Sequence, residues 1–424
     1  MNHLTTPLLL AAALLAGQAR AAELALFDFT DRAPQAGYTR VAPDAVYTKE
    51  RGHGYDSAAQ PGKPVYFSVD LPEGNYNVTV TLGGAQAGVT TIKSELRRLM
   101  LDNVRTAPGT VEQRTFTVNI RTPRIPASNT LAAGAVRLKA PRETVQEAWN
   151  WDPRLTLEFN GAHPVVRSMT ITPVRAPTVF LLGDSTVSDQ PGEPYASWGQ
   201  MLPRYFKPGI AIANHAQSGE TYRDSLQRRR LDKVLSAMQP GDTVLMQFGH
   251  NDQKQIKEGK GGPFTTYLDE IRQHVVAIRA HGGIPVIVSS MERRAFDASG
   301  KVVPSLIDYA NAARQAATEL DTPFIDLNAL SKPLYETLGV EGSKAAFAQP
   351  QGKVDNTHHS NYGACQLAQL VATGMRRQGL AAAYWLADGY GAYDPLKPDP
   401  VAAFAVPPSP TYSNERPLGD EANQ

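Results

Sequence analysis

The chain has 424 residues, of which 42% are hydrophobic and 20% charged, and 42 Lys and Arg against 41 Asp and Glu leave a net charge of +1. This length predicts at least two domains with substantial cores. The balanced charge argues against nucleic acid or an anionic membrane surface as a partner. The single cysteine, Cys365, excludes an intramolecular disulfide, and its apolar neighbours predict a core position.

The N-terminus carries an export pattern. An apolar run over residues 7–17 precedes Ala19-Arg20-Ala21, which places small residues where signal peptidase prefers them. We therefore expect residues 1–21 to be a secretory signal peptide, with a buried first helix as the alternative. No other stretch reaches the roughly 18 to 20 apolar residues that a membrane span needs. Export without disulfides predicts a bacterial periplasmic or secreted protein.

Short segments with alternating apolar and polar residues follow, separated by Gly, Pro and Asn. They lie at 65–69, 77–82, 114–120 and 155–159. A period of two is typical of half-buried antiparallel strands. Several such strands with few helical patterns between them predict a β-sandwich domain over residues 22–175.

The pattern changes after Arg175-Ala176-Pro177. Near-continuous apolar strands at 178–183, 210–213, 243–248, 284–289 and 323–327 alternate with helical patterns at 197–206, 225–238, 266–281, 305–319 and 362–377. Strands that lack a polar face are covered on both sides. We therefore expect a five-stranded parallel sheet in a three-layer α/β/α domain over residues 176–393. The proline-rich residues 394–424 predict a tail that lies extended on the surface or is disordered.

Two of the predicted strand ends carry candidate catalytic groups. The first strand leads into Gly183-Asp184-Ser185, which places the hydroxyl of Ser185 at the carboxyl edge of the sheet. Ser185 is a candidate nucleophile, with a helix cap or Asx turn as the alternative. The second strand precedes Gly219, which can bring a bare backbone N–H close to a substrate oxygen or simply form a turn.

The third strand end presents His250, Asn251 and Asp252 in succession. The neutral amide of Asn251 is a donor that suits an oxyanion, or alternatively caps the next segment. His250 can be a structural hydrogen-bonding residue. This strand end therefore offers a candidate donor for the same edge of the sheet.

A fourth segment, which opens the last predicted helix, contains Asp355 and His358. Residues three apart in such a turn approach on one side, so Asp355 can hold Nδ1–H of His358 while Nε2 faces Ser185. An Asp cap with solvent-exposed histidines is the alternative. The adjacent His358 and His359 side chains diverge, which argues against a metal site.

Taken together and in this order, these four segments resemble the SGNH hydrolases, also called GDSL esterases, over roughly residues 177–380. The matching residues are Gly183-Asp184-Ser185, Gly219, Gly249-His250-Asn251-Asp252 and Asp355-Asn356-Thr357-His358. The resemblance implies a flavodoxin-like α/β/α fold and a reaction that needs no metal or organic cofactor. It implies Ser185 as nucleophile, His358 as general base, Asp355 as its partner, and an oxyanion hole of Ser185 N–H, Gly219 N–H and Asn251 Nδ2.

More narrowly, Thr186 after the first segment and Phe248 before the third resemble the rhamnogalacturonan acetylesterase branch. This resemblance implies an acetylated polysaccharide or oligosaccharide as substrate, from pectin. Arg223, His250 and Asp252 are expected to contact it. Glu220 and His359 depart from the pattern of the branch. Alternatives are an acetylxylan esterase, a broad-specificity lipase or thioesterase of the same superfamily, or a glycan-binding protein without esterase activity.

The predicted sandwich loosely resembles galactose-binding-like modules, which makes residues 22–175 a candidate carbohydrate-binding domain. Four aromatic residues are candidates for stacking on sugar rings: Tyr55, Tyr76, Trp149 and Trp151. For the two tryptophans, whose spacing predicts one face of a strand, we favour core packing. The run Arg228-Arg229-Arg230 is expected to be a solvated helix face. The sequence leaves the oligomeric state open.

Overall fold

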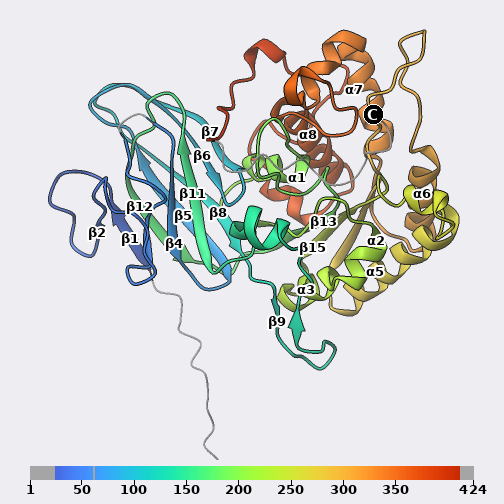
Figure 1. Cartoon of the computed structure of the whole chain (residues 1–424), viewed down its shortest axis with the longest axis horizontal. Helices are drawn as coiled ribbons and strands as arrows, with labels where there is room; N and C mark the ends of the chain where they lie inside the picture. Colours follow the sequence, from blue (N-terminus) through green and yellow to red (C-terminus); the bar gives the residue numbers. More distant parts are fainter. Residues whose placement is uncertain (1–23, 61–62, 411–424) are drawn as a thin grey trace, which may run out of the picture.

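The computed structural model describes residues 24–60 and 63–410. Figure 1 shows an all-β part formed by the N-terminal strands beside an α/β part formed by the rest of the chain. The expected signal peptide, residues 1–21, lies outside the described residues, and so does the end of the tail, residues 411–424. Across the described ranges, no helix combines the length and the apolarity needed to cross a membrane.

The all-β part consists of two five-stranded sheets with the orders β2-β1-β12-β5-β8 and β3-β4-β11-β6-β7. Neighbouring strands are antiparallel except for the pair of β1 and β2. The strands are β1 (Ala25–Asp28), β2 (Thr39–Arg40), β3 (His53–Tyr55), β4 (Val65–Asp70), β5 (Gly74–Leu82), β6 (Gly88–Ser94), β7 (Arg98–Thr106), β8 (Glu112–Ile120), β11 (Arg154–Asn160) and β12 (Val166–Pro173), with a small hairpin of β9 (Arg124–Ile125) and β10 (Gly134–Ala135).

The alternating pattern of β5 shows why the two sheets pack face to face. Tyr76, Val78 and Val80 are buried, whereas the residues between them are half-buried. The apolar set joins one core with Phe67 and Leu157 from the other sheet. Side chains of a strand alternate between faces, so a period of two buries one face of each sheet. The predicted β-sandwich is confirmed.

The α/β part contains a parallel sheet with the order β14-β13-β15-β16-β17. Its strands are β13 (Thr178–Gly183), β14 (Ala211–Asn214), β15 (Thr243–Gln247), β16 (Ile284–Val288) and β17 (Phe324–Ile325), each within two residues of the predicted bounds. The strand order is that of flavodoxin-like folds, in which ligands bind beyond the carboxyl ends of the first strand and its two neighbours.

Helices cover both faces of this sheet, as predicted. Leu181 packs with Trp198 and Leu367 on one face, and its neighbour Leu182 packs with Val234 and Ile271 on the other. The first face carries α1 (Trp198–Met201), α7 (Leu327–Gly342) and α8 (Asn361–Arg377), and the second carries α2 (Tyr222–Gln227), α3 (Arg230–Ala237), α5 (Leu268–Ala280) and α6 (Ile307–Glu319), while α4 (Lys254–Lys257) lies in the loop after β15. The predicted three-layer α/β/α fold is confirmed.

Two helical segments differ from the prediction. The pattern at 225–238 is not one helix, because Arg229 adopts a left-handed conformation (φ 61°) that separates α2 from α3. Helix α7 was not predicted, because Pro333 interrupts its pattern and Gly339 departs from helical geometry. Its start is nevertheless locally encoded, since the Asp326 side chain accepts a hydrogen bond from Ala329 N at 3.2 Å.

The β6–β7 turn of the sandwich enters the α/β part. Leu96, Arg97 and Arg98 are all buried at this turn. The carbonyl oxygen of Leu96 accepts a hydrogen bond from Gln200 Nε2 at 2.7 Å, and Leu99 belongs to the same apolar core as helix α8. The two parts therefore share a buried interface and are not joined by a linker alone.

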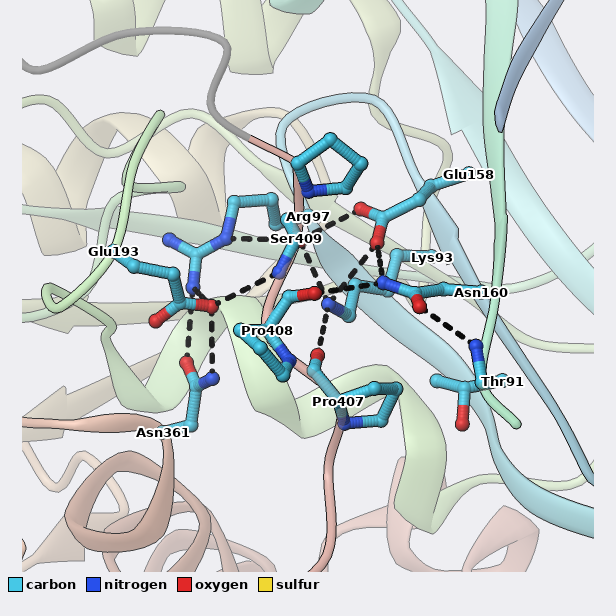
Figure 2. Close-up of polar contacts among 12 residues, drawn as sticks. Thr91, Lys93, Arg97, Glu158, Asn160, Glu193, Asn361, Pro407, Pro408 and Ser409 are labelled. Atoms are coloured by element: carbon cyan, nitrogen blue, oxygen red, sulfur yellow. Dashed lines mark hydrogen bonds and ion pairs between the residues drawn. The ribbon is translucent and has the colours of Figure 1, made fainter. Parts of the chain in front are cut away.

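The described part of the tail, residues 394–410, runs back across this interface (Figure 2). Lys93 Nζ donates to Pro407 O and to Ser409 Oγ, both at 2.7 Å. Ser409 Oγ in turn donates to Glu158 at 2.7 Å, and Lys93 and Glu158 form a buried ion pair. Of residues 394–410, Val406 alone is buried and the others are exposed or half-buried, so this stretch lies on the surface as expected, and buried charges of the sandwich bind its residues 407–409.

Candidate active site

Ser185 lies in a tight turn at the carboxyl end of β13. The Asp184 side chain accepts hydrogen bonds from Thr186 N at 2.9 Å and from Thr186 Oγ1 at 2.7 Å, which closes the turn. Gly183 is required there because a Cβ would lie 2.7 Å from the carbonyl oxygen of Gln247 on the neighbouring strand. The local sequence thus turns the chain sharply and presents Ser185 at the edge of the sheet.

The three residues predicted to form the catalytic set lie in one hydrogen-bonded chain. Ser185 Oγ is 2.9 Å from His358 Nε2, and His358 Nδ1 is 3.0 Å from Asp355 Oδ2. The other Asp355 oxygen accepts the backbone N–H groups of Thr357 and His358 at 2.8 and 2.9 Å. Burial alone would raise the pKa of Asp355, but these hydrogen bonds lower it below its usual value. The carboxylate is therefore charged and can hold the imidazole in one orientation.

The loop that carries His358 is fixed by its neighbour His359, which is fully buried. His359 Nε2 lies 2.8 Å from the hydroxyl of Tyr335, and its ring packs against Phe347 at 4.5 Å. Burial lowers the pKa of His359 to about 3, so the ring is neutral and serves as an aromatic core residue. Within the described ranges, no three His, Cys, Asp or Glu side chains converge on a candidate metal site.

Two of the three predicted oxyanion donors, Gly219 and Asn251, line a common pocket of about 340 Å³. Gly219 has a left-handed backbone (φ 73°), and Asn251 Nδ2 is oriented by a 3.1 Å hydrogen bond to Glu220 O. Gln190 links the two loops, since its Nε2 lies 2.6 Å from Ser185 O and 3.4 Å from Ser218 Oγ. The structure thus brings all five predicted residues to one edge of the sheet.

The residues expected to contact substrate divide into two kinds. His250 and Asp252 are buried beneath the site, His250 Nδ1 lying 3.5 Å from Asp184 Oδ2 and Asp252 accepting from Tyr222 N at 3.2 Å. Neither lines the pocket beside Gly219, but Ser185 and His358 are equally buried, so substrate contact by His250 and Asp252 stays a prediction. Arg223 does line the pocket, although its Nε pairs with Glu270 at 2.8 Å.

Glu220, which departs from the branch pattern, is buried and paired. Arg230 Nε lies 2.6 Å from Glu220, and Arg230 Nη2 lies 2.7 Å from Glu143 in the segment before β11. The expectation that this part of the arginine run is solvated is therefore wrong. Two buried carboxylates compensate the charge, which makes the buried guanidinium tolerable.

The aromatic residues proposed to stack on sugars are mostly inaccessible. Tyr55, Tyr76 and Trp151 have exposed fractions of 6%, 1% and 6%. Trp149 and Trp151 lie in and just after a short helical turn, not on a strand, and Trp149 packs 4.9 Å from the ring of Tyr66. The three buried rings are part of the cores and cannot form a sugar-binding platform.

Sequence reasoning missed several residues around the site. Lys254 Nζ lies 3.4 Å from Asn251 Oδ1, and Lys254 and Lys260 line the pocket with Gly219. The Tyr195 ring packs edge-on against His358 with centroids 6.0 Å apart. The charges of the lysines were visible in the sequence, but their approach to Gly219 depends on the tertiary fold.

Residues 181–358 match the GDSL-like Lipase/Acylhydrolase family. Rhamnogalacturonan acetylesterase RhgT of Bacillus subtilis (strain 168) is 40% identical over 213 residues, which cover 48% of this chain and 90% of RhgT. Probable rhamnogalacturonan acetylesterase YesY of the same organism is 31% identical over 206 residues, covering 48% of this chain and 94% of YesY.

The match to uncharacterized esterase YxiM of Bacillus subtilis (strain 168) extends through both parts, with 27% identity over 384 residues that cover 84% of this chain and 91% of YxiM. The crystal structure of YxiM gives a TM-score of 0.47 at 23% identity and covers 85% of this chain and 100% of that one. The family match contains all four segments around Ser185. The chain belongs to the GDSL-like lipase/acylhydrolase family, the SGNH hydrolases, and is a carboxylic ester hydrolase.

Proposed function

We propose that this protein is a serine acetylesterase that removes O-acetyl groups from rhamnogalacturonan. The observation that carries the proposal is the hydrogen-bonded chain of Ser185, His358 and Asp355 beside two oxyanion donors. It occurs in a chain that is 40% identical to a rhamnogalacturonan acetylesterase over nearly the whole of that relative. An acetylated pectic polysaccharide or oligosaccharide is the substrate that this combination supports.

In the first half of the proposed reaction, Ser185 Oγ attacks the acetyl carbonyl while His358 Nε2 accepts its proton. The negative charge that develops on the carbonyl oxygen is held by the N–H groups of Ser185 and Gly219 and by Asn251 Nδ2. The intermediate then collapses, and the sugar oxygen leaves with the proton from His358. Asp355 stabilises the imidazolium throughout.

In the second half, water attacks the acetyl group on Ser185, and His358 accepts a proton from that water. The same donors hold the second oxyanion. Collapse returns the proton to Ser185 and releases acetate. The chain's own residues therefore account for every proton transfer in the cycle.

The pocket beside Gly219 supports a polar, acidic substrate over a lipid. Its lining side chains include three cations, Arg223, Lys254 and Lys260, and two carboxylates, Asp224 and Glu258. Arg223 pairs with Glu270, and Lys260 pairs with Glu258. In the described part of the chain, Lys254 forms no ion pair, and its ammonium contacts only a neutral amide oxygen. Lys254 is thus the cation available for a uronate carboxylate next to the acetylated sugar.

The test compares acetate release from acetylated rhamnogalacturonan, acetylated xylan and acetylated homogalacturonan. We expect the highest kcat/KM on rhamnogalacturonan. Lys254→Met is expected to raise KM several-fold for the acidic polymers but not for xylan, because only the acidic polymers lose an ionic contact. Lys257→Met is the matched control, since this exposed residue of α4 does not line the pocket.

Each alternative predicts a distinct result in this comparison. Faster acetate release from xylan would contradict the pectin proposal and favour an acetylxylan esterase. A preference for long-chain p-nitrophenyl esters over the acetate would favour a lipase or thioesterase. No hydrolysis of any ester, with retention on one of the polysaccharides, would favour a glycan-binding protein.

We also propose that the protein is exported, to the periplasm or beyond the cell. The pattern over residues 1–21 supports this proposal. The mass of the protein isolated from the organism's envelope or medium tests it, because cleavage after Ala21 would leave Ala22 as the first residue. A full-length protein retained in the cytoplasm would contradict export.

A further inference from the structure

We propose that Arg97, a residue of the N-terminal sandwich, positions both the nucleophile and the general base, so that the sandwich completes the active site. The inference rests on the proposed esterase function. Arg97 lies on the turn between β6 and β7, and its side chain is only 3% exposed (Figure 2). It is a positioning residue, because it acts through other groups and does not contact the reacting atoms.

The turn between β6 and β7 has an unusual backbone conformation. Glu95 and Arg97 both have left-handed backbones, with φ values of 52° and 63°. Residues other than glycine rarely adopt this conformation, and it persists where surrounding contacts enforce it, often at functional sites. Here the enforcing contacts come from the α/β part, through Gln200 and the core around Leu99. The strained turn therefore aims Arg97 into the catalytic part.

Arg97 binds the loop that follows the nucleophile. Its Nη1 donates to the carbonyl oxygens of Gln190 at 3.1 Å and Tyr195 at 2.8 Å. The Gln190 side chain in turn donates to Ser185 O at 2.6 Å, and the Tyr195 ring packs edge-on against His358. The Arg97 guanidinium is thus connected to Ser185 through Gln190 and to His358 through Tyr195.

Arg97 also binds the helix that follows the base. Its Nη2 lies 2.6 Å from Glu193 Oε1 and 3.0 Å from Asn361 Oδ1, and Asn361 Nδ2 donates to the same Glu193 oxygen at 3.0 Å. Asn361 is the first residue of α8, directly after the His358 loop. Figure 2 shows Arg97, Glu193 and Asn361 converging from three segments. The planar, multidentate donor geometry of arginine suits this junction and lysine cannot reproduce it.

A second buried cation of the same interface provides the control. Lys233 Nζ on α3 pairs with Glu73 of the sandwich at 2.5 Å and donates to Arg124 O at 2.8 Å. Lys233 is as buried as Arg97 but its contacts do not involve the loops around Ser185 and His358. Replacement of Lys233 therefore removes an ion pair between the two parts and leaves the contacts of the loops around Ser185 and His358 unchanged.

The experiment uses the full chain with p-nitrophenyl acetate and compares Arg97→Met, Arg97→Gly and Lys233→Met. Both Arg97 variants are expected to lose 10- to 100-fold in kcat, roughly the cost of misplacing catalytic groups by about 1 Å, with KM changed less than about threefold. Glycine adopts the left-handed backbone conformation without strain, so the Tm of Arg97→Gly should differ from that of Arg97→Met. The kcat should fall to the same extent in both variants. Lys233→Met should lower Tm and keep kcat.

A wild-type kcat in a folded Arg97 variant would overturn the inference, and so would a kcat that simply follows Tm across the three variants. If neither Arg97 variant folds, the kcat of Asn361→Ala is measured instead. A lower kcat is expected, and an unchanged kcat would contradict the inference. Ser185→Ala is assayed in parallel. Its activity tests the esterase function itself, so an inactive Ser185→Ala beside fully active Arg97 variants would refute only the role of Arg97.

Discussion

Asp355 serves the site with both carboxylate oxygens, and this sets it apart from an ordinary capping residue. One oxygen faces His358 Nδ1 at 3.0 Å and the other closes the turn by accepting two backbone N–H groups. A carboxylate only accepts hydrogen bonds, so it selects the tautomer with the proton on Nδ1. That tautomer leaves Nε2 free to accept the proton of Ser185.

We predict that Asp355→Asn lowers kcat on the order of 10³- to 10⁴-fold, because an amide can donate to Nδ1 and favour the wrong tautomer. The measurement is kcat with p-nitrophenyl acetate. Asp242→Asn is the matched control: Asp242 is also buried and accepts two backbone N–H groups, from Thr178 and Gln239, at the opposite end of the sheet. It should lose stability but not kcat, and equal kcat losses in both variants would contradict a specific role for Asp355.

Residues were predictable from the sequence where their role follows from local position. Ser185 and Asn251 stand directly after apolar strands, and Asp355 and His358 open a helix, so their meeting at one sheet edge follows from the parallel topology. Arg97 carries no such signal. It acts across the interface between the two parts, and nothing in a β-turn of a sandwich indicates that a distant loop needs its guanidinium group.

At the scale of elements, the order of the strands assembles the site. The strands β13, β14 and β15 are neighbours, and the loops after them carry Ser185, Gly219 and Asn251. Their continuous apolar sequences made all three predictable, because strands covered on both faces need no polar alternation. The fourth segment comes from the N-terminal side of α8, on the face that also carries α1.

The helices α2 and α3 show where prediction of elements fails. The arginine run at their junction has the composition of a solvated face. Arg230 is nevertheless buried, because Glu143, far earlier in the chain, supplies a compensating charge. Burial of a charged residue depends on its partner, and a pairing between distant segments has no signature in either segment alone.

At the scale of the whole molecule, the sandwich and the α/β part form one unit. The β6–β7 turn enters the catalytic part, and residues 407–409 return to the sandwich and contact Lys93. The segment before β11 also reaches the loop that carries Gly219, since Lys139 Nζ donates to Ser218 O at 2.6 Å. These contacts support the proposed role of the sandwich in catalysis.

The buried histidines make the whole fold sensitive to acid. Burial lowers the pKa of His274 to about 4 and that of His359 to about 3, and lowers that of His215 well below its usual value. An unfolded chain takes up these protons below about pH 6.5, whereas the folded chain does not. The stabilisation is therefore complete above that pH and is lost as the pH falls toward the folded values.

We predict that each of these histidines lowers the free energy of unfolding as the pH falls from 6.5 to 5, by up to about 1.4 kcal/mol per pH unit. Urea titrations at several pH values measure this slope. His274→Gln should remove the contribution of one histidine from the slope of the free energy of unfolding against pH. His163→Asn, at an exposed position, should leave this slope unchanged. An equal slope in the wild type and His274→Gln would contradict the prediction, whereas the total slope also contains opposite contributions from buried carboxyls such as Glu95 and Asp252, whose pKa values burial raises.

Ser185 is the proposed nucleophile of the acetylesterase, and every step of the proposed reaction passes through its hydroxyl group. The most direct measurement is the initial rate of acetate release from acetylated rhamnogalacturonan by the wild-type chain and by Ser185→Ala of equal Tm. We predict release by the wild type and a rate lower by on the order of 10⁴-fold or more in Ser185→Ala, because the acyl acceptor is lost. Comparable rates from the two proteins would contradict the proposed mechanism.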